Sequence, residues 1–194
     1  IRAAVGWVRE VVGEAMLPEH LVLMHCVSAY PTPLPEANIR VVPYLAECFG
    51  VPVGYSNHVI GLEACFAAVA LGAHVIEVHF TDSKLDRSFR DHELSLEPQE
   101  LAELVRTVPK LRASLGTGIK APTPCEIGNT AVLRKGLVAA RDLSAGTTLV
   151  REDLMFARPA TEFAASEIND VIGLCLKEAV GQGQLIGREQ VRQT

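Results

Sequence analysis

The segment 54–80 constrains the fold more than any other part of this sequence, because it predicts a strand, a helix and a second strand in direct succession. It begins with a short β-prone run, the Ala- and Leu-rich part at 62–71 is typical of a buried helix, and alternation of apolar and polar residues follows at 74–80. Two strands joined by one helix are nearly always parallel, with a right-handed crossover. We therefore expect His58, just past the first strand, and His79, at the end of the second, to meet at the same edge of a sheet.

This histidine pair is a candidate metal site. Alternation places Val75, Glu77 and His79 on one face of the second strand. Burying a carboxylate and an imidazole in a packed interior costs free energy unless these groups bind a ligand or a metal. Two imidazoles at the carboxyl ends of parallel strands suit a divalent metal, with positions left open for water and substrate. The alternative is that His58 begins a helix and His79 is a hydrogen-bonded strand-end residue, and the pattern leaves both interpretations open.

The composition is that of an ordinary globular protein. The chain has 194 residues, of which 48% are hydrophobic and 21% charged, and its formal net charge is −5. Scattered Lys and Arg argue against a nucleic-acid partner. No apolar run reaches the roughly 20 residues of a membrane span, and the start lacks the regions of a signal peptide, so we expect a cytoplasmic protein with no membrane partner. Five dispersed cysteines, mostly in apolar surroundings, predict reduced core residues.

Helix and strand patterns alternate through the first part of the chain. After an initial amphipathic helix we expect a buried strand at 21–27, a helix at about 36–49, the 54–80 unit, a polar loop at 81–97 and a helix at about 98–115. Strict alternation requires a parallel sheet covered by helices, either doubly wound or a (β/α)8 TIM barrel. The sequence has no Gly-x-Gly-x-x-Gly after a strand, and polar residues follow every strand, which favours the barrel.

The expected domain organisation has three parts. Three strands are fewer than the eight of a barrel and would leave unpaired edges, so we expect 1–113 to be the last three βα units of a barrel in a longer protein. The Gly, Pro, Thr and polar composition of 114–131 predicts a linker. Short runs with Gly-centred turns at 132–194 predict a small, mostly β domain.

Several stretches resemble, in their order along the chain, the N-acetylneuraminate (sialic acid) synthase family, which includes legionaminic and pseudaminic acid synthases. They are His-Cys-Val-Ser-Ala-Tyr-Pro-Thr-Pro at 25–33, Gly-Tyr-Ser-Asn-His at 54–58, Leu-Gly-Ala-His-Val-Ile-Glu-Val-His-Phe-Thr at 71–81, Asp-His-Glu-Leu-Ser-Leu-Glu-Pro at 91–98, Leu-Val-Ala-Ala-Arg-Asp-Leu at 137–143, Glu-Asp-Leu at 152–154 and Arg-Pro at 158–159. The resemblance implies an α/β fold in which the C-terminal part of a TIM barrel precedes a β-clip SAF (antifreeze-like) domain. It also implies a domain-swapped homodimer in which that domain covers the partner's active site.

The resemblance implies a reaction as well. Phosphoenolpyruvate condenses with an N-acetylated amino sugar, N-acetylmannosamine or a relative, to give a sialic-acid-type product and phosphate. By this resemblance His58 and His79 hold a divalent metal, Mn²⁺ or Mg²⁺. Glu77, which alternation places on the face of His79, is expected to belong with the two histidines to the catalytic set. The implied substrate-binding residues are Ser28 and Ser56 for phosphoenolpyruvate, Tyr30 and Asp91 for the sugar, and Arg158 of the SAF domain for the sugar's N-acetyl group.

Each substrate-binding candidate also has a simpler interpretation. Tyr30 precedes a proline and could be a loop anchor, while Ser28 and Ser56 could be turn residues. Asp91 could cap a turn. Arg158 could be a solvated surface charge.

Three positions depart from the family pattern. Asn57 stands where Asp is usual, Val78 where Lys is common, and Phe89-Arg90 where Gly-Pro precedes the aspartate. We expect Asn57 to soften the orientation of the metal site and Val78, on the outward face by parity, to matter less. The family's lysines and glutamate from earlier strands are not in this sequence, so we expect this chain alone to be inactive.

Two other functions remain open. A metal-dependent barrel aldolase or lyase would use the same histidine pair without phosphoenolpyruvate and release no phosphate. A non-catalytic SAF module would bind a carbohydrate or a partner protein. His25 faces opposite to Ser28 and is expected to be a buried, hydrogen-bonded residue rather than a ligand.

Overall fold

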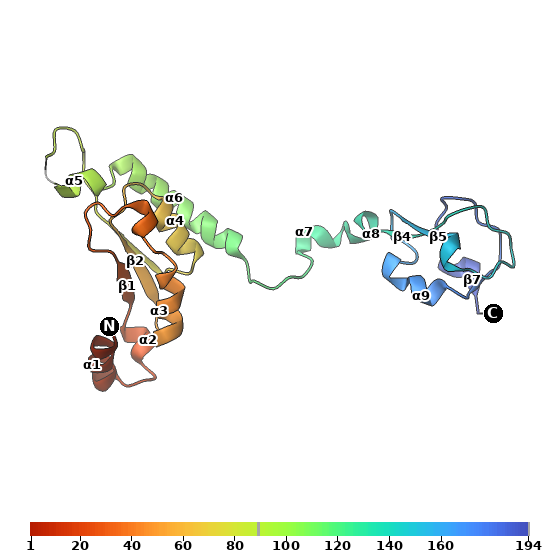
Figure 1. Cartoon of the computed structure of the whole chain (residues 1–194), viewed down its shortest axis with the longest axis horizontal. Coiled ribbons are helices and arrows are strands. Elements are labelled where there is room, and N and C mark those ends of the chain that lie inside the picture. Colours follow the sequence, from red (N-terminus) through yellow and green to blue (C-terminus); the bar gives the residue numbers. More distant parts are fainter. Residues whose placement is uncertain (89, 194) are drawn as a thin grey trace. The chain divides into compact units, whose positions relative to one another are not determined.

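The computed structural model describes residues 1–88 and 90–193, and these form two compact units, Ile1–Ile119 and Lys120–Thr194 (Figure 1). Phe89, one of the departures from the family pattern, lies outside the described residues. In the described ranges no helix combines the length and the apolar character that a membrane crossing needs.

The first unit is built on a three-stranded parallel sheet in the order β1-β2-β3. Its strands are β1 (Leu23–Cys26), β2 (Val53–Asn57) and β3 (Val75–Val78). The register pairs Cys26 with Ser56 and Ser56 with Glu77. The predicted parallel pairing of the strands that flank the 62–71 helix is therefore confirmed.

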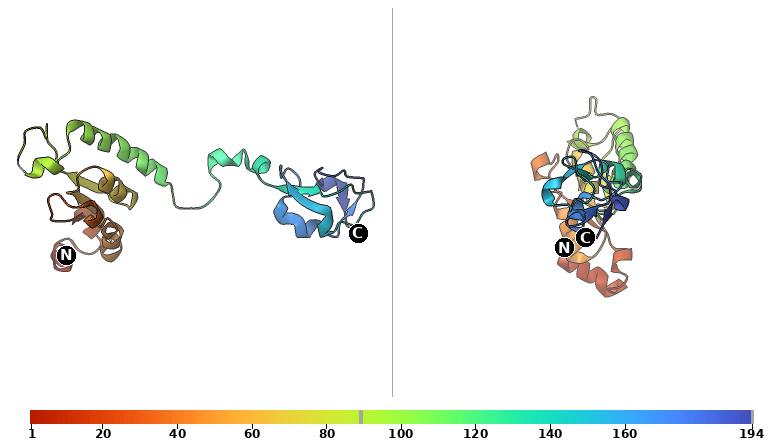
Figure 2. Two further views of the ribbon diagram at one scale, coloured as in Figure 1. Left: turned by 45° about the horizontal axis from the view of Figure 1, so that its top comes forward. Right: turned by 90° about the vertical axis from the view of Figure 1, so that its right-hand side faces the viewer.

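Helices cover one face of this sheet, as Figures 1 and 2 show. The helical elements of the unit are α1 (Arg2–Val12), α2 (Leu17–His20), the 3-10 turn η1 (Leu34–Glu36), α3 (Val41–Phe49), α4 (Glu63–Ala70), α5 (Arg90–Leu94) and α6 (Pro98–Leu115). Tyr55 of β2 packs with Leu45 of α3, Cys65 of α4 and Leu104 of α6 in one apolar core. Val78 packs against the same core, as its parity predicted.

Three boundaries differ from the expected ones. The helix expected at 36–49 begins only at Val41, because Asn38 adopts a left-handed conformation with φ 47°. The loop expected at 81–97 contains α5. The segment expected as a linker contains α7 (Pro124–Ile127), which a capping box between Thr123 and Glu126 begins, and α8 (Thr130–Leu133).

The second unit consists of short strands, turns and one small apolar core. Strand β4 (Gly136–Ala139) pairs antiparallel with β5 (Leu154–Ala157), and β6 (Cys175–Leu176) pairs with β7 (Val191–Arg192). The remaining elements are η2 (Arg151–Asp153), η3 (Ala165–Glu167), α9 (Ile168–Val171) and η4 (Arg188–Gln190). A 2.7 Å ion pair from Arg141 Nη2 to the buried Asp153 carboxylate connects the end of β4 to the start of β5.

The expectation that the cysteines are mostly core residues is wrong for three of the five. All five are free thiols, but Cys26, Cys48 and Cys125 are exposed, whereas Cys65 and Cys175 are buried. Cys26 lies in edge strand β1, and Cys125 lies in α7, where no apolar core forms around it. Burial raises the pKa of the Cys65 thiol to about 12.

The raised pKa of Cys65 makes the stability of the first unit sensitive to alkali. The buried thiol must stay neutral, so its contribution is complete below pH 9, the ordinary range of a thiol, and falls as pH rises toward 12. We expect Cys65→Ala to flatten the decrease in unfolding free energy between pH 9 and 11 by about 2 kcal/mol. Urea titrations at several pH values measure this, with the exposed Cys48→Ala as the control that keeps the slope.

We expect any side chain at Gly136 to destabilise the second unit. A Cβ at this position would lie 2.6 Å from the carbonyl oxygen of Pro159 and 2.9 Å from that of Phe163. Because both obstacles are backbone, we expect Gly136→Ala to destabilise the second unit by about 1–3 kcal/mol. Calorimetry measures this, with Trp7 fluorescence reporting the first unit alone. Gly128→Ala is the control, since a Cβ there has open space and φ is −63°.

Candidate active site

His58 and His79 lie next to each other at the carboxyl edge of the sheet. Their ring centroids are 5.3 Å apart and the rings are inclined by 61°. The β2–β3 register produces this approach, because Asn57 pairs with Val78 and each histidine is the next residue in its strand's direction. The expected meeting of the two histidines is confirmed.

The orientation of the His58 ring is fixed by a backbone acceptor. Its Nδ1 lies 2.8 Å from the carbonyl oxygen of Val27, and a carbonyl can only accept, so Nδ1 carries the hydrogen and, in the neutral ring, Nε2 has the lone pair. The backbone N–H of Thr32 donates to the carbonyl oxygen of His58 at 2.7 Å. Two hydrogen bonds therefore join the loop after β1 to His58, one through the imidazole ring and one through the backbone carbonyl.

Tyr30 covers the histidine pair. Its ring lies 4.0 Å from that of His58 at an angle of 35°, and 6.1 Å from that of His79 in an edge-on arrangement. Tyr30 itself is 45% exposed, whereas His58 is only 4% exposed. One face of the Tyr30 ring thus shields His58 and the rest of the side chain borders solvent.

The face of the sheet without helices carries further polar candidates. Ser56 is buried at the end of β2, between Cys26 and Glu77 in the register, and Ser28 is exposed in the loop after β1. Within the described residues Glu77 is exposed on this face.

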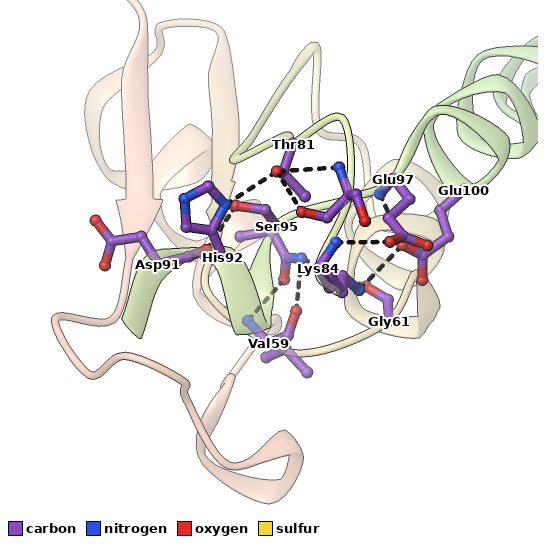
Figure 3. Close-up of polar contacts among 11 residues, drawn as sticks. Val59, Gly61, Thr81, Lys84, Asp91, His92, Ser95, Glu97 and Glu100 are labelled. Atoms are coloured by element: carbon purple, nitrogen blue, oxygen red, sulfur yellow. Dashed lines mark hydrogen bonds and ion pairs between the residues drawn. The ribbon is translucent and has the colours of Figure 1, made fainter. Parts of the chain in front are cut away.

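The segment that returns after β3 fixes the backbone of His79. The N–H of Leu96 donates to the carbonyl oxygen of His79 at 2.8 Å, and the N–H of Thr81 donates to the carbonyl oxygen of Leu96 at 2.9 Å. The Thr81 hydroxyl lies 2.9 Å from Nδ1 of His92. The Asp91 side chain points away from this network, while its carbonyl oxygen accepts the Ser95 hydroxyl at 2.5 Å (Figure 3).

The same loop is fastened to the start of α6. The backbone N–H of Lys84 donates to the Glu97 carboxylate at 2.8 Å, and its ammonium donates to Glu100 at 3.1 Å (Figure 3). The backbone N–H of Glu97, followed by Lys84, holds the pKa of the Glu100 carboxyl below its ordinary value. These hydrogen bonds therefore attach the loop that carries Asp91 to the N-terminal end of α6.

Arg158 and His25 each have their own surroundings. Arg158 belongs to the second unit, where it follows β5 and is exposed. The chain after it is held by backbone hydrogen bonds, from Ala160 N–H to the carbonyl oxygen of Ala131 at 2.8 Å and from Leu137 N–H to that of Phe163 at 3.0 Å. His25 is buried and donates from Nε2 to the carbonyl oxygen of Ala37 at 2.8 Å, which confirms that it is a structural histidine.

The histidine pair offers part of a metal site. In the part of the chain that the structure describes, no three His, Cys, Asp or Glu side chains are grouped so as to hold a metal ion. His58 and His79 supply two neighbouring nitrogen donors, and the contact of His58 with Val27 leaves Nε2 available. A divalent metal fits such a pair when oxygen ligands from water or substrate complete its coordination.

Two features of the site were missed in the sequence. The carbonyl of Val27 has no sequence signal, because every residue carries one. Cys26, whose sulfur lies 3.8 Å from Nδ1 of His58, could have been found. It shares the face of Ser28 by alternation, and a parallel register places it beside Ser56.

Comparison with known proteins decides the family. The model of the NeuB family matches residues 1–120, and the model of the SAF domain matches residues 134–192. The chain belongs to the NeuB family. Its two units correspond to these two matches, and three strands of the expected barrel are present in the chain.

Several relatives have names that specify a product. The chain is 36% identical to an N,N'-diacetyllegionaminic acid synthase of Legionella pneumophila, over 98% of this chain and 53% of that protein. It is 44% identical to an N-acetylneuraminate-9-phosphate synthase of Mus musculus, over 68% of this chain and 36% of that protein. A solved structure of a putative spore coat polysaccharide biosynthesis protein E from Chromobacterium violaceum superposes with a TM-score of 0.70 at 25% identity, over 99% of this chain and 58% of that one. The chain thus spans about half the length of the Legionella relative.

The shielding of His58 by Tyr30 can be tested chemically in this NeuB-family chain. We expect Tyr30→Ala to accelerate the ethoxycarbonylation of His58 by diethylpyrocarbonate several-fold, because the aromatic ring that covers the imidazole is removed. Mass spectrometry of peptides after short exposures measures the rate. Tyr44→Ala, at an exposed position of α3, is the matched control and should leave that rate unchanged. An unchanged rate in Tyr30→Ala would show that Tyr30 does not cover the ring in solution.

Proposed function

We propose that this chain is the C-terminal part of a nonulosonic acid synthase, which condenses phosphoenolpyruvate with an N-acetylated amino sugar and releases phosphate. The observation that carries the proposal is the pairing of His58 and His79 at the carboxyl ends of adjacent parallel strands in a NeuB-family chain. The names of the relatives support it, since they include legionaminic, pseudaminic and N-acetylneuraminate-9-phosphate synthases.

In the proposed enzyme, His58 and His79 hold Mn²⁺ or Mg²⁺ through ring nitrogens, with His58 using Nε2. A divalent cation bound there supplies Lewis-acid polarisation of the sugar aldehyde. Val27 keeps the hydrogen of His58 on Nδ1, so Nε2 of the neutral ring would be the nitrogen that holds the cation, without a change of tautomer. Tyr30 limits the access of water to one side of His58.

The other residues have proposed roles in binding. Ser56 and Ser28 would donate hydroxyl hydrogen bonds to phosphoenolpyruvate at the end of the sheet, near Glu77 of the catalytic set. Tyr30 and Asp91 would contact the sugar. These assignments rest on the matching positions in the family, together with the register that places Ser56 beside Glu77.

Closure of the site requires a second copy in this proposal. Arg158 would reach the sugar's N-acetyl group from the SAF domain of the other subunit of a domain-swapped homodimer. The exposure of Arg158 leaves its guanidinium available for such a contact.

The test is phosphate release by the full-length protein that contains this chain, with phosphoenolpyruvate, N-acetylmannosamine and Mn²⁺. We expect His58→Ala and His79→Ala each to lower the rate by about three orders of magnitude, because the cation contributes several kcal/mol to the barrier. His74→Ala is the matched control, since His74 is an exposed histidine just before β3.

The outcome separates the proposal from its rivals. Metal-dependent release that is lost in both variants supports the synthase and the ligand pair. Absence of release with this sugar and with the legionaminic and pseudaminic precursors contradicts the proposal. Sugar cleavage without phosphoenolpyruvate would instead indicate an aldolase or lyase, and carbohydrate binding without turnover would indicate a binding module.

A further inference from the structure

The amide of Asn57 uses all of its hydrogen-bonding capacity inside the protein. The side chain is 2% exposed. Its Nδ2 donates to the carbonyl oxygens of Val59 at 2.9 Å and Gly61 at 3.4 Å. Its Oδ1 accepts from the Tyr55 hydroxyl at 3.0 Å and from the Val59 N–H at 3.2 Å. One side chain therefore ties the end of β2 to the turn that follows it.

In this chain an amide matches all four partners, whereas the Asp that is usual at this position in the family has no N–H for the two carbonyl oxygens. Both carbonyl oxygens need a donor, and a buried carbonyl that faces a carboxylate oxygen would be left without one. The Tyr55 hydroxyl remains a donor, because burial raises the pKa of this phenol to about 12. Gly61 adopts φ 97°, a left-handed conformation that brings its carbonyl into reach of Nδ2.

His58 lies inside the turn that this amide holds. Its neighbour on one side is Asn57 itself and on the other is Val59, which bonds to the amide through both its N–H and its carbonyl. The His58 ring bonds to Val27 and its carbonyl oxygen to Thr32, so both contacts depend on the path of the backbone at 57–59. Asn57 does not touch the imidazole in any of its four hydrogen bonds.

We propose that Asn57 is a positioning residue, whose amide sets the ring orientation and the Nδ1–H tautomer of His58 by fixing the turn at 57–61. The sequence had suggested that Asn57 softens the orientation of the metal site, whereas this geometry assigns the opposite effect. The consequence for metal binding rests on the proposed function, but the effect on the His58 tautomer does not.

Asn57→Asp is the sharpest variant, because it keeps the shape and the acceptor, removes the two donors and adds a carboxylate charge, which the exposed control Asn169→Asp also adds. In the wild-type protein labelled with 15N-histidine, long-range 1H–15N spectra should show His58 as the Nδ1–H tautomer, with His58→Gln used to assign the signal. In Asn57→Asp the two ring nitrogens should converge on the average of the protonated and unprotonated nitrogen shifts, as expected for mixed neutral tautomers, and not on the shift of an imidazolium ring. Asn169→Asp, an exposed change of the same chemistry in α9, should leave the signal unchanged.

A second readout follows the loss of free Mn²⁺ by electron paramagnetic resonance during titration. We expect Asn57→Asp to weaken Mn²⁺ binding by about 10- to 100-fold and Asn169→Asp to leave it unchanged. If wild type binds no Mn²⁺ but the tautomer changes in Asn57→Asp, the positioning role stands and the proposed metal function fails. If Asn57→Asp folds and the tautomer is unchanged, the positioning role is overturned whatever the metal does.

Tyr55→Phe provides a milder variant in case Asn57→Asp does not fold. It removes one donor to Oδ1 and keeps the aromatic ring in the core. The amide should then reorient part of the time, and we expect a detectable share of the second His58 tautomer. If Asn57→Asp is unfolded, an unchanged tautomer in Tyr55→Phe overturns the proposal.

Discussion

The parallel pairing of β2 with β3 is the constraint on which the candidate site depends. Hydrogen bonds between the strands set Asn57 opposite Val78, and one further residue along each strand brings His58 and His79 together. The crossover helix α4 makes this pairing possible, because its small residues pack closely on β2. A shift of the register by one residue would turn one histidine to the other face of the sheet.

Strand β2 separates two kinds of side chain. Val53 and Tyr55 enter the apolar core beneath the helices, whereas Ser56 lies on the face that carries Glu77. At the end of the strand Asn57 is buried as well, but its side chain donates hydrogen bonds to the backbone of the turn that follows. The rigidity of the core is thus transmitted to His58 through the backbone.

Much of this arrangement could be predicted from the sequence, because it follows from local patterns. Alternation and the right-handed crossover were enough to place His58 beside His79, and parity was enough to place His25 and Val78. The features that could not be predicted depend on backbone geometry, which the types of the side chains do not indicate. The left-handed conformation of Asn38 shortens a helix. The acceptor for His58 is the backbone carbonyl of Val27, and every residue type has such a carbonyl.

We propose that His58 and His79 bind one divalent cation together. Anomalous diffraction near the manganese absorption edge, from crystals of the full-length protein grown with Mn²⁺, would locate such a cation. We expect one anomalous peak within bonding distance of His58 Nε2 and of a ring nitrogen of His79. Its coordination should be completed by oxygen atoms. Crystals that contain bound Mn²⁺ elsewhere, with no peak between these two rings, would contradict this proposal.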